Sequence, residues 1–90
     1  MLTHIVIWKY RAEASERERE EHVALLRALP KSIPQIESFA VGFDVLQLPR
    51  SYDTGLVATF RDRTGLAVYT DHPEHQIAAH VASVDFESEG

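Results

Sequence analysis

The chain has 90 residues, of which 44% are hydrophobic and 26% are charged, and such fractions are ordinary for one globular domain. It carries 9 Lys and Arg residues against 14 Asp and Glu residues, which gives a formal net charge of −5. Because the basic residues are scattered, the sequence argues against binding of nucleic acid or of an anionic membrane surface. Cysteine is absent, which excludes disulfides, thiol catalysis and zinc–thiolate sites.

The hydropathy pattern contains no apolar run long enough to span a bilayer, and the first residues lack the layout of a signal peptide. We therefore expect a cytoplasmic protein with a single domain over residues 1–90. A domain of this size buries a thin hydrophobic core, so assembly into a homo-oligomer is a natural expectation.

Residues 3–10 (THIVIWKY) are rich in β-branched and aromatic side chains, which predicts a strand. Because side chains alternate along a strand, its two faces carry different residues. One face carries His4, Val6, Trp8 and Tyr10. The other face carries Ile5, Ile7 and Lys9. Both faces are mostly apolar, which is typical of a strand that is covered on both sides.

A helix is predicted to begin at Ser15, because Ser15 and Glu18 have the spacing of a capping box. The apolar positions that follow recur at helical spacing and form one stripe. The helix should weaken or stop at about Leu29, since Pro30 cannot donate a backbone hydrogen bond, and Pro34 closes the segment.

Two further strands are predicted over residues 38–48 and 54–61, joined by a turn at 49–53. Gly42 is a candidate for a β-bulge in the first of them. The second of them places alternate residues on one face, namely Thr54, Leu56, Ala58 and Phe60. Asp62 is expected to cap a second helix that ends near residue 71.

Residues 74–80 are expected to form a short helical turn, and residues 81–86 the last strand. The resulting order is that of the ferredoxin-like α+β fold, βαββαβ, with an antiparallel four-stranded sheet and both helices on one face. The other face carries Ile5, Ile7 and Val57, and no further segment of the chain is left to cover it. A second copy of the chain is the expected cover, with the two sheets packed face to face or closed into a barrel.

The densest cluster of chemical groups is the segment 69–75 (YTDHPEH), which holds two imidazoles, two carboxylates and a phenol. Imidazole transfers protons near neutral pH, and Pro73 fixes the backbone between His72 and His75. The same residues are also compatible with the solvated end of a helix, where His72 favours the helix dipole. A metal site is disfavoured, because the two histidines lack the i, i+4 spacing of a helical metal pair.

Three other histidines are interpreted individually. His4 lies on the strand face that is expected to meet the helices, and His22 extends the apolar stripe of the first helix. Each is either a core histidine with a backbone partner or a pocket-lining donor or base. His80 is expected to be structural or exposed.

Three segments together resemble the stress-responsive A/B barrel (Dabb) family: HIVIWKY at 4–10, SYDTGLVATF at 51–60 and YTDHPEH at 69–75. The resemblance covers residues 2–87. It implies a ferredoxin-like protomer that pairs into a dimeric α+β barrel, in agreement with the sheet face that the chain itself leaves uncovered.

Some members of this family are stress proteins without settled chemistry, whereas others resemble polyketide cyclases of the olivetolic acid cyclase type. The resemblance to these cyclases implies that His75 acts as a base and that Tyr69 orients it. It also implies that His4 lines the same pocket. No metal or organic cofactor is expected, because the acidity of a carbon between two carbonyl groups is within reach of an imidazole base.

The sequence departs from the cyclase pattern at three pocket positions. Thr54 replaces a His, Leu26 replaces a Tyr, and His22 replaces an aromatic residue. The stretch from His75 to Asp85 is also shorter than in the family pattern, so the pocket is expected to be altered or open. The candidate substrate-binding residues are Trp8, His22, Leu26, Phe39, Thr54 and His72.

Two classes of function are open. In the first, the chain is an enzyme in which His75 removes a proton from a carbon between two carbonyl groups, as in a cyclisation, an isomerisation or a lyase step. His4 then polarises an oxygen of a small, mostly apolar carbonyl or phenolic compound. In the second, the chain is a stress-response or assembly protein, or a module that binds a small ligand without turnover.

Overall fold

The structure of the chain, a computed structural model, describes residues 1–70 and 78–89, with residues 68–70 described by their backbone alone. Its elements are, in chain order, β1 (Leu2–Tyr10), α1 (Glu16–Arg27), α2 (Leu29–Ser32), β2 (Ile36–Phe43), β3 (Thr54–Phe60), α3 (Arg63–Thr70) and β4 (Ala78–Glu87). The predicted order of elements is confirmed. The first helix is divided at Ala28, close to the position where Pro30 predicted that it would weaken.

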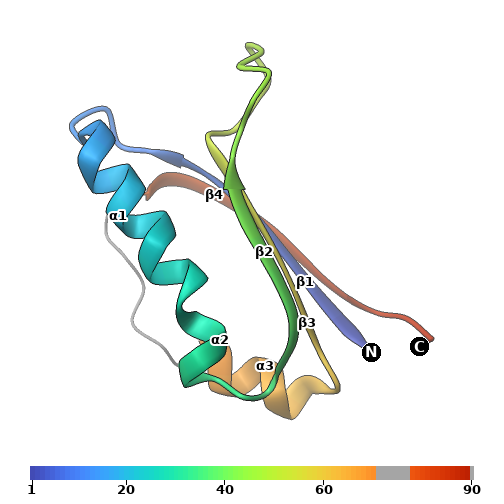
Figure 1. The fold of residues 1–90 in the computed structure, drawn as a ribbon. Coiled ribbons are helices and arrows are strands. Elements are labelled where there is room, and N and C mark those ends of the chain that lie inside the picture. Colours follow the sequence, from blue (N-terminus) through green and yellow to red (C-terminus); the bar gives the residue numbers. More distant parts are fainter. Residues whose placement is uncertain (71–77, 90) are drawn as a thin grey trace.

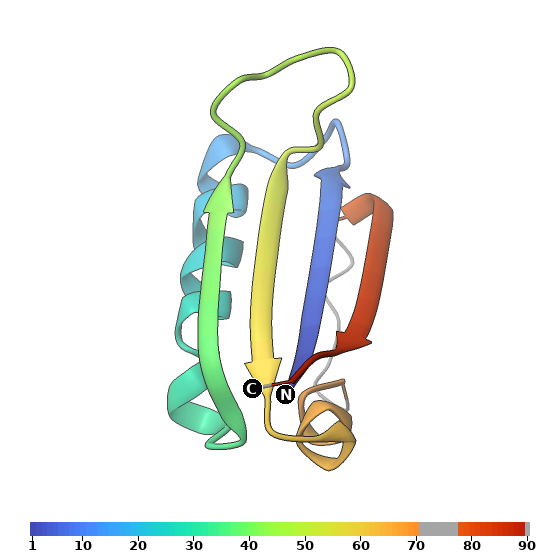
Figure 2. The ribbon, with the colours of Figure 1, turned by 90° about the vertical axis from the view of Figure 1, so that its right-hand side faces the viewer.

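β1 lies inside the sheet, between β3 and β4, and the strand order is β2-β3-β1-β4 (Figure 2). Neighbouring strands are antiparallel throughout the described sheet. The register places His4 opposite Asp85 of β4, and it places Trp8 between Thr54 of β3 and Val81 of β4. This arrangement is the ferredoxin-like α+β fold that the sequence predicted.

The helices lie on one side of the sheet, as the edge-on view in Figure 1 shows. α1 packs against β2, and α3 contacts β1, β2 and β3. A buried apolar cluster comes from alternate positions of β1 and β3 and consists of Leu2, Trp8, Tyr10, Leu56, Ala58 and Phe60. The predicted inward face of β3 is therefore confirmed.

The opposite side of the sheet carries a second set of apolar side chains, from the intervening strand positions. This open face includes Ile5, Ile7, Val57, Val84 and Phe86. Val57 is 42% exposed and Val84 is 54% exposed. The described helices are on the other side, so no described helix covers these side chains (Figure 1).

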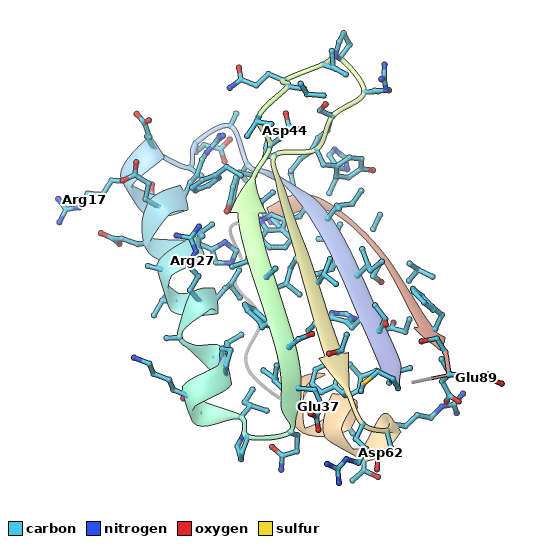
Figure 3. The ribbon with its side chains drawn as sticks, turned by 45° about the vertical axis from the view of Figure 1, so that its right-hand side comes forward. Arg17, Arg27, Glu37, Asp44, Asp62 and Glu89 are labelled. Atoms are coloured by element: carbon cyan, nitrogen blue, oxygen red, sulfur yellow. The ribbon has the colours of Figure 1, made fainter. Side chains whose placement is uncertain are left out.

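The capping box predicted at the start of α1 is confirmed. The backbone N–H of Glu18 donates to Ser15 Oγ at 3.1 Å, and the backbone N–H of Ser15 donates to Glu18 Oε1 at 2.9 Å. At the other end of α1, Arg27 Nη2 donates to the carbonyl oxygen of Val41 at 3.4 Å and links the helix to β2. Arg17 extends from the same helix away from the sheet (Figure 3).

Residues 44–48 differ from the prediction, because β2 ends at Phe43 and does not continue to residue 48. The backbone N–H of Asp44 donates to the carbonyl oxygen of Asp53 at 2.8 Å, which closes a loop between β2 and β3. Within that loop Gln47 has a left-handed backbone, with φ of 52°. The Asp44 carboxylate accepts from the Gln47 backbone N–H at 2.5 Å, so the chain turns directly after Phe43, although the apolar alternation of the sequence continues to Val45.

The irregularity in the pairing of β2 with β3 also lies at a different position from the one expected. Gly42 pairs regularly with Gly55, and the register shifts between Ile36 and Ser38. The extra residue there is Glu37, at the end of the sheet opposite the loop (Figure 3). A glycine permits a bulge without requiring one, so the position of Gly42 was an insufficient signal.

β4 begins at Ala78, earlier than the predicted start at residue 81. The helical turn expected over 74–80 is therefore wrong for residues 78–80, which belong to β4; Ala78 and His80 pair with β1, and Ala79 is the extra residue at a shift in register. Residues 74–77 lie outside the described part of the chain. Pairing with β1 outweighs the weak strand preference of alanine.

The capping box makes stability depend on the charge of Glu18. Hydrogen bonds from the Ser15 backbone N–H and then from its side chain hold the pKa of the Glu18 carboxyl below its ordinary value of 4.5. A lowered pKa in the folded state gives a contribution that is present above pH 4.5 and is lost as the pH falls through the lowered pKa. Glutamine keeps an acceptor but has no charge.

We therefore expect Glu18→Gln to melt at a lower temperature than the wild type at pH 7, with a difference that disappears in strongly acidic solution. Thermal unfolding of both proteins across this pH range measures the difference, with Glu20→Gln on the same helix as the control. A difference that grows as the pH falls would contradict this role of Glu18.

Candidate functional site

His4 lies on the face of β1 that meets the helices, and 9% of its surface is exposed. Asp85 is its direct neighbour on β4. His4 Nδ1 lies 2.5 Å from Asp85 Oδ1, as expected for opposite residues of an antiparallel pair whose side chains point to the same face. The sequence left open a core histidine with a backbone partner and a pocket-lining donor or base, and it gave no sign of this carboxylate.

The carboxylate determines how the His4 ring can be used. When Nδ1–H donates to Asp85, the lone pair of the neutral ring lies on Nε2. A proton can be gained or lost at Nε2 while the ring keeps its hydrogen bond to the carboxylate. A histidine oriented in this way is suited to acid–base chemistry.

An open cavity of about 610 Å³ adjoins this pair, at the end of the sheet where α3 lies. Its walls come from β1, α3 and β4 and are formed by Leu2, Arg63, Leu66, Ala67, Asp85, Phe86 and Glu87. Arg63 Nε and Glu87 Oε1 form an exposed ion pair at 3.2 Å. The cavity therefore combines apolar walls with charged groups, one of which is the partner of His4.

A second cluster of rings lies toward the other end of β1. The Tyr10 hydroxyl is 3.1 Å from His22 Nδ1, and the Thr54 hydroxyl donates to the Tyr10 oxygen at 3.3 Å. The rings of Trp8, Tyr10 and His22 pack edge to face, with centroids 5.5 to 6.3 Å apart. The Arg19 guanidinium lies 5.0 Å from the centre of the Tyr10 ring. This ring cluster joins α1 to β1 and β3.

The structure brings together some of the predicted substrate-binding residues. Trp8, His22 and Thr54 all belong to the ring cluster and are buried. Leu26 and Phe39 are half-buried and pack against the apolar core. These five residues therefore lie between the sheet and the helices, and the assignment of any of them to a ligand stays a prediction.

Three residues that the sequence singled out cannot be placed in the same way. His72 and His75 lie outside the described residues, and Tyr69 belongs to α3 but is described by its backbone alone. α3 also supplies Leu66 to the cavity beside Asp85. The pairing of Tyr69 with His75 stays a prediction.

Two residues of these hydrogen-bonded groups were not singled out from the sequence. Tyr10 shares a strand face with His4, and that alternation was a usable signal. Asp85 is a carboxylate between Val84 and Phe86 in a strand, which is an unusual place for a charge. Its partner could not be read from the sequence, because the register between β4 and β1 joins segments that are far apart in the chain.

Within residues 1–70 and 78–89, no group of three or more His, Asp or Glu side chains could hold a metal ion. No helix in the described part of the chain is long and apolar enough to cross a membrane.

The sheet order, the helices on one side and the cavity beside a His–carboxylate pair define a ferredoxin-like α+β protein with a candidate small-molecule site. The family model of the stress responsive A/B barrel domain, Dabb, matches residues 2–88, and the chain belongs to this family. No curated protein sequence matches the chain significantly.

Solved structures with the same fold cover nearly the whole chain. A protein from Arabidopsis thaliana is 21% identical, with a TM-score of 0.80, and the match covers 100% of this chain and 97% of that one. A dimeric ferredoxin-like protein of unknown function from Thermobifida fusca is 26% identical, with a TM-score of 0.80 and coverage of 94% and 88%. A hydroxynitrile lyase from Passiflora edulis is 13% identical, with a TM-score of 0.81 and coverage of 94% and 90%.

The ring cluster generates a prediction about stability. Tyr10→Phe removes the acceptor of the hydroxyl of Thr54, a residue that is 2% exposed, and it removes a hydrogen bond of His22. We expect the free energy of unfolding to fall by about 1–3 kcal/mol, because buried polar groups lose partners. Urea unfolding at a fixed protein concentration measures this change.

Tyr52→Phe is the matched control, because the Tyr52 hydroxyl makes no hydrogen bond with the described residues. We expect that control to change the free energy of unfolding by less than about 0.5 kcal/mol. Equal losses of unfolding free energy in the two variants would show that the hydrogen bonds of the Tyr10 hydroxyl do not stabilise the fold specifically.

Proposed function

We propose that the chain is an enzyme without metal or organic cofactor that moves a proton on a small, mostly apolar carbonyl or phenolic compound. The observation that carries the proposal is the contact between His4 and Asp85 beside the cavity of about 610 Å³. In this proposal His75 is the base and Tyr69 orients it, as the resemblance to polyketide cyclases implies. A cytoplasmic location remains the prediction made from the sequence.

The chemistry requires little beyond these side chains. The base removes a proton from a carbon between two carbonyl groups, and the electron pair moves onto a carbonyl oxygen as an enolate. The protonated ring of His4 donates its Nε2–H to that oxygen, while Asp85 keeps its hydrogen bond to Nδ1. The enolate then attacks a second carbonyl, takes a proton at another carbon or expels a leaving group. These outcomes correspond to cyclisation, isomerisation and a lyase step.

A protein that binds a small compound without turnover, or acts as a stress-response or assembly protein, is the second candidate. Val81 favours it, because this side chain faces the helix side of the sheet opposite Trp8 and is nevertheless 62% exposed. Water at this position weakens the electrostatic interactions that an acid–base step uses. The contact between His4 and Asp85 would then serve the fold alone.

Exchange of deuterium for hydrogen at carbon distinguishes the two candidates. The probe is a β-dicarbonyl acid deuterated between its carbonyl groups, followed by NMR in the presence of the protein. We expect the wild type to accelerate the exchange, and His75→Ala and His4→Asn each to lower that acceleration by roughly 100-fold or more, the usual effect of losing an acid–base group.

His80→Ala is the control for this experiment, because His80 is an exposed histidine of β4. It should exchange the probe at the wild-type rate. Exchange no faster than in imidazole buffer, or equal rates in all four proteins, would count against an enzyme. Saturable binding of the probe without exchange would support the binding protein.

We infer as well that two copies of the chain form a homodimer through their open faces, with the two sheets closing an α+β barrel. The apolar side chains Ile5, Ile7 and Val57 on this face support the inference, because a contiguous exposed apolar surface is unfavourable in water. The dimeric state of the Thermobifida fusca protein supports it as well.

Light scattering after size exclusion tests the homodimer. We expect the wild type at twice the chain mass of 10.2 kDa, and Val57→Glu at the chain mass, because a buried carboxylate at the centre of the interface lacks a partner. Val45→Glu introduces the same charge on the loop between β2 and β3, where Val45 is 87% exposed, and should remain dimeric. A wild type that elutes as a monomer, or a dimeric Val57→Glu, would contradict the inferred interface.

A further inference from the structure

The indole of Trp8 is a buried donor whose hydrogen has no acceptor among the described residues. Trp8 is 5% exposed, and its Nε1 is buried without a hydrogen-bond partner there. Buried N–H groups in folded proteins almost always have an acceptor, because an unpaired one keeps its full desolvation penalty. This N–H therefore indicates that a molecule that binds to the protein supplies the acceptor.

The neighbours of Trp8 in the ring cluster do not supply that acceptor. The Tyr10 oxygen already accepts from Thr54, so the Tyr10 hydroxyl hydrogen is available to His22 Nδ1. A neutral His22 then carries its hydrogen on Nε2 and has no second acceptor nitrogen to offer. Both residues pack against the indole through their rings.

An exposed strip of β4 connects Trp8 with the candidate site. The side chains of β4 that face the helices are exposed from Val81, opposite Trp8, through Ser83 to Asp85, opposite His4. His4 and Trp8 are four residues apart on one strand, so their Cα atoms are separated by about 13 Å. The residue between them on this face is the apolar Val6. A mostly apolar stretch of the surface thus separates the indole N–H of Trp8 from the polar pair of His4 and Asp85.

We propose that Trp8 donates its indole N–H to an acceptor oxygen of the bound compound, while His4 and Asp85 contact a second polar group at its other end. The inference rests on the proposed function and adds the shape of the substrate to it. The substrate class is an elongated, mostly apolar compound with two oxygen functions on the order of 10 Å apart. Nε1 is covered in this structure, so the oxygen reaches it only after the side chains over it move aside.

Trp8 is the single tryptophan of the 90-residue chain, so its indole N–H gives one assigned cross-peak in a proton–nitrogen NMR spectrum of this chain. The probes are hexanophenone, which carries one ketone oxygen, and hexylbenzene, which has the same carbon skeleton without it. We expect hexanophenone to move the indole proton resonance downfield, and hexylbenzene to leave it near its ligand-free position. Titration of both probes into Trp8→Phe completes the comparison, because this variant keeps an aromatic ring and lacks the donor.

In the wild type we expect hexanophenone to bind more tightly than hexylbenzene. In Trp8→Phe we expect this preference for the ketone to fall by roughly twofold to tenfold, the usual effect of one hydrogen bond. Equal weakening of both probes would show that Trp8 acts through packing, and an unmoved indole resonance in the wild type would show that the ketone does not reach it. Either result overturns this inference. The proposed function is still supported in that case if the wild type accelerates deuterium exchange and His4→Asn does not. Failure of the wild type to bind either probe would count against both the role of Trp8 and the proposed function.

Discussion

β1 is hydrogen-bonded on both sides, to β3 and to β4, and the register of these two ladders determines which side chains meet. A slip by one residue would turn every side chain of β1 to the other face of the sheet. His4 would then lose Asp85, and Trp8 and Tyr10 would together lose their contacts with His22 of α1. The correct pairing of this strand is therefore a condition for both the buried core and the candidate site.

The two faces of β1 have different chemistry because of the period-two alternation. The face toward the helices combines large apolar side chains with polar groups that pair with one another, such as Tyr10 with His22. The open face carries Ile5 and Ile7 without polar groups between them. One strand thus contributes to a site on one side and to a surface suited for self-association on the other, which is efficient in a chain of 90 residues.

Local patterns predicted most of the fold, because alternation and helix capping act over a few residues. The faces of β1 and β3 and the capping box at Ser15 are of this kind. The end of β2 was mispredicted, because the apolar alternation continues to Val45 whereas the chain already turns at Asp44, whose carboxylate accepts the Gln47 backbone N–H. The partner of His4 was missed for another reason: Asp85 reaches it through a pairing of distant segments, which local patterns do not encode.

The strand order also has a consequence for the time course of folding. β2 and β3 are joined by one loop and can pair soon after they are made, whereas β1 pairs only with segments from the second half of the chain. Contacts between distant segments slow folding, since a long loop must close before they form. β1 is therefore synthesised before either of the strands with which it pairs. Both of its hydrogen-bonding edges stay unsatisfied until the hairpin docks on one side and the last strand closes the other.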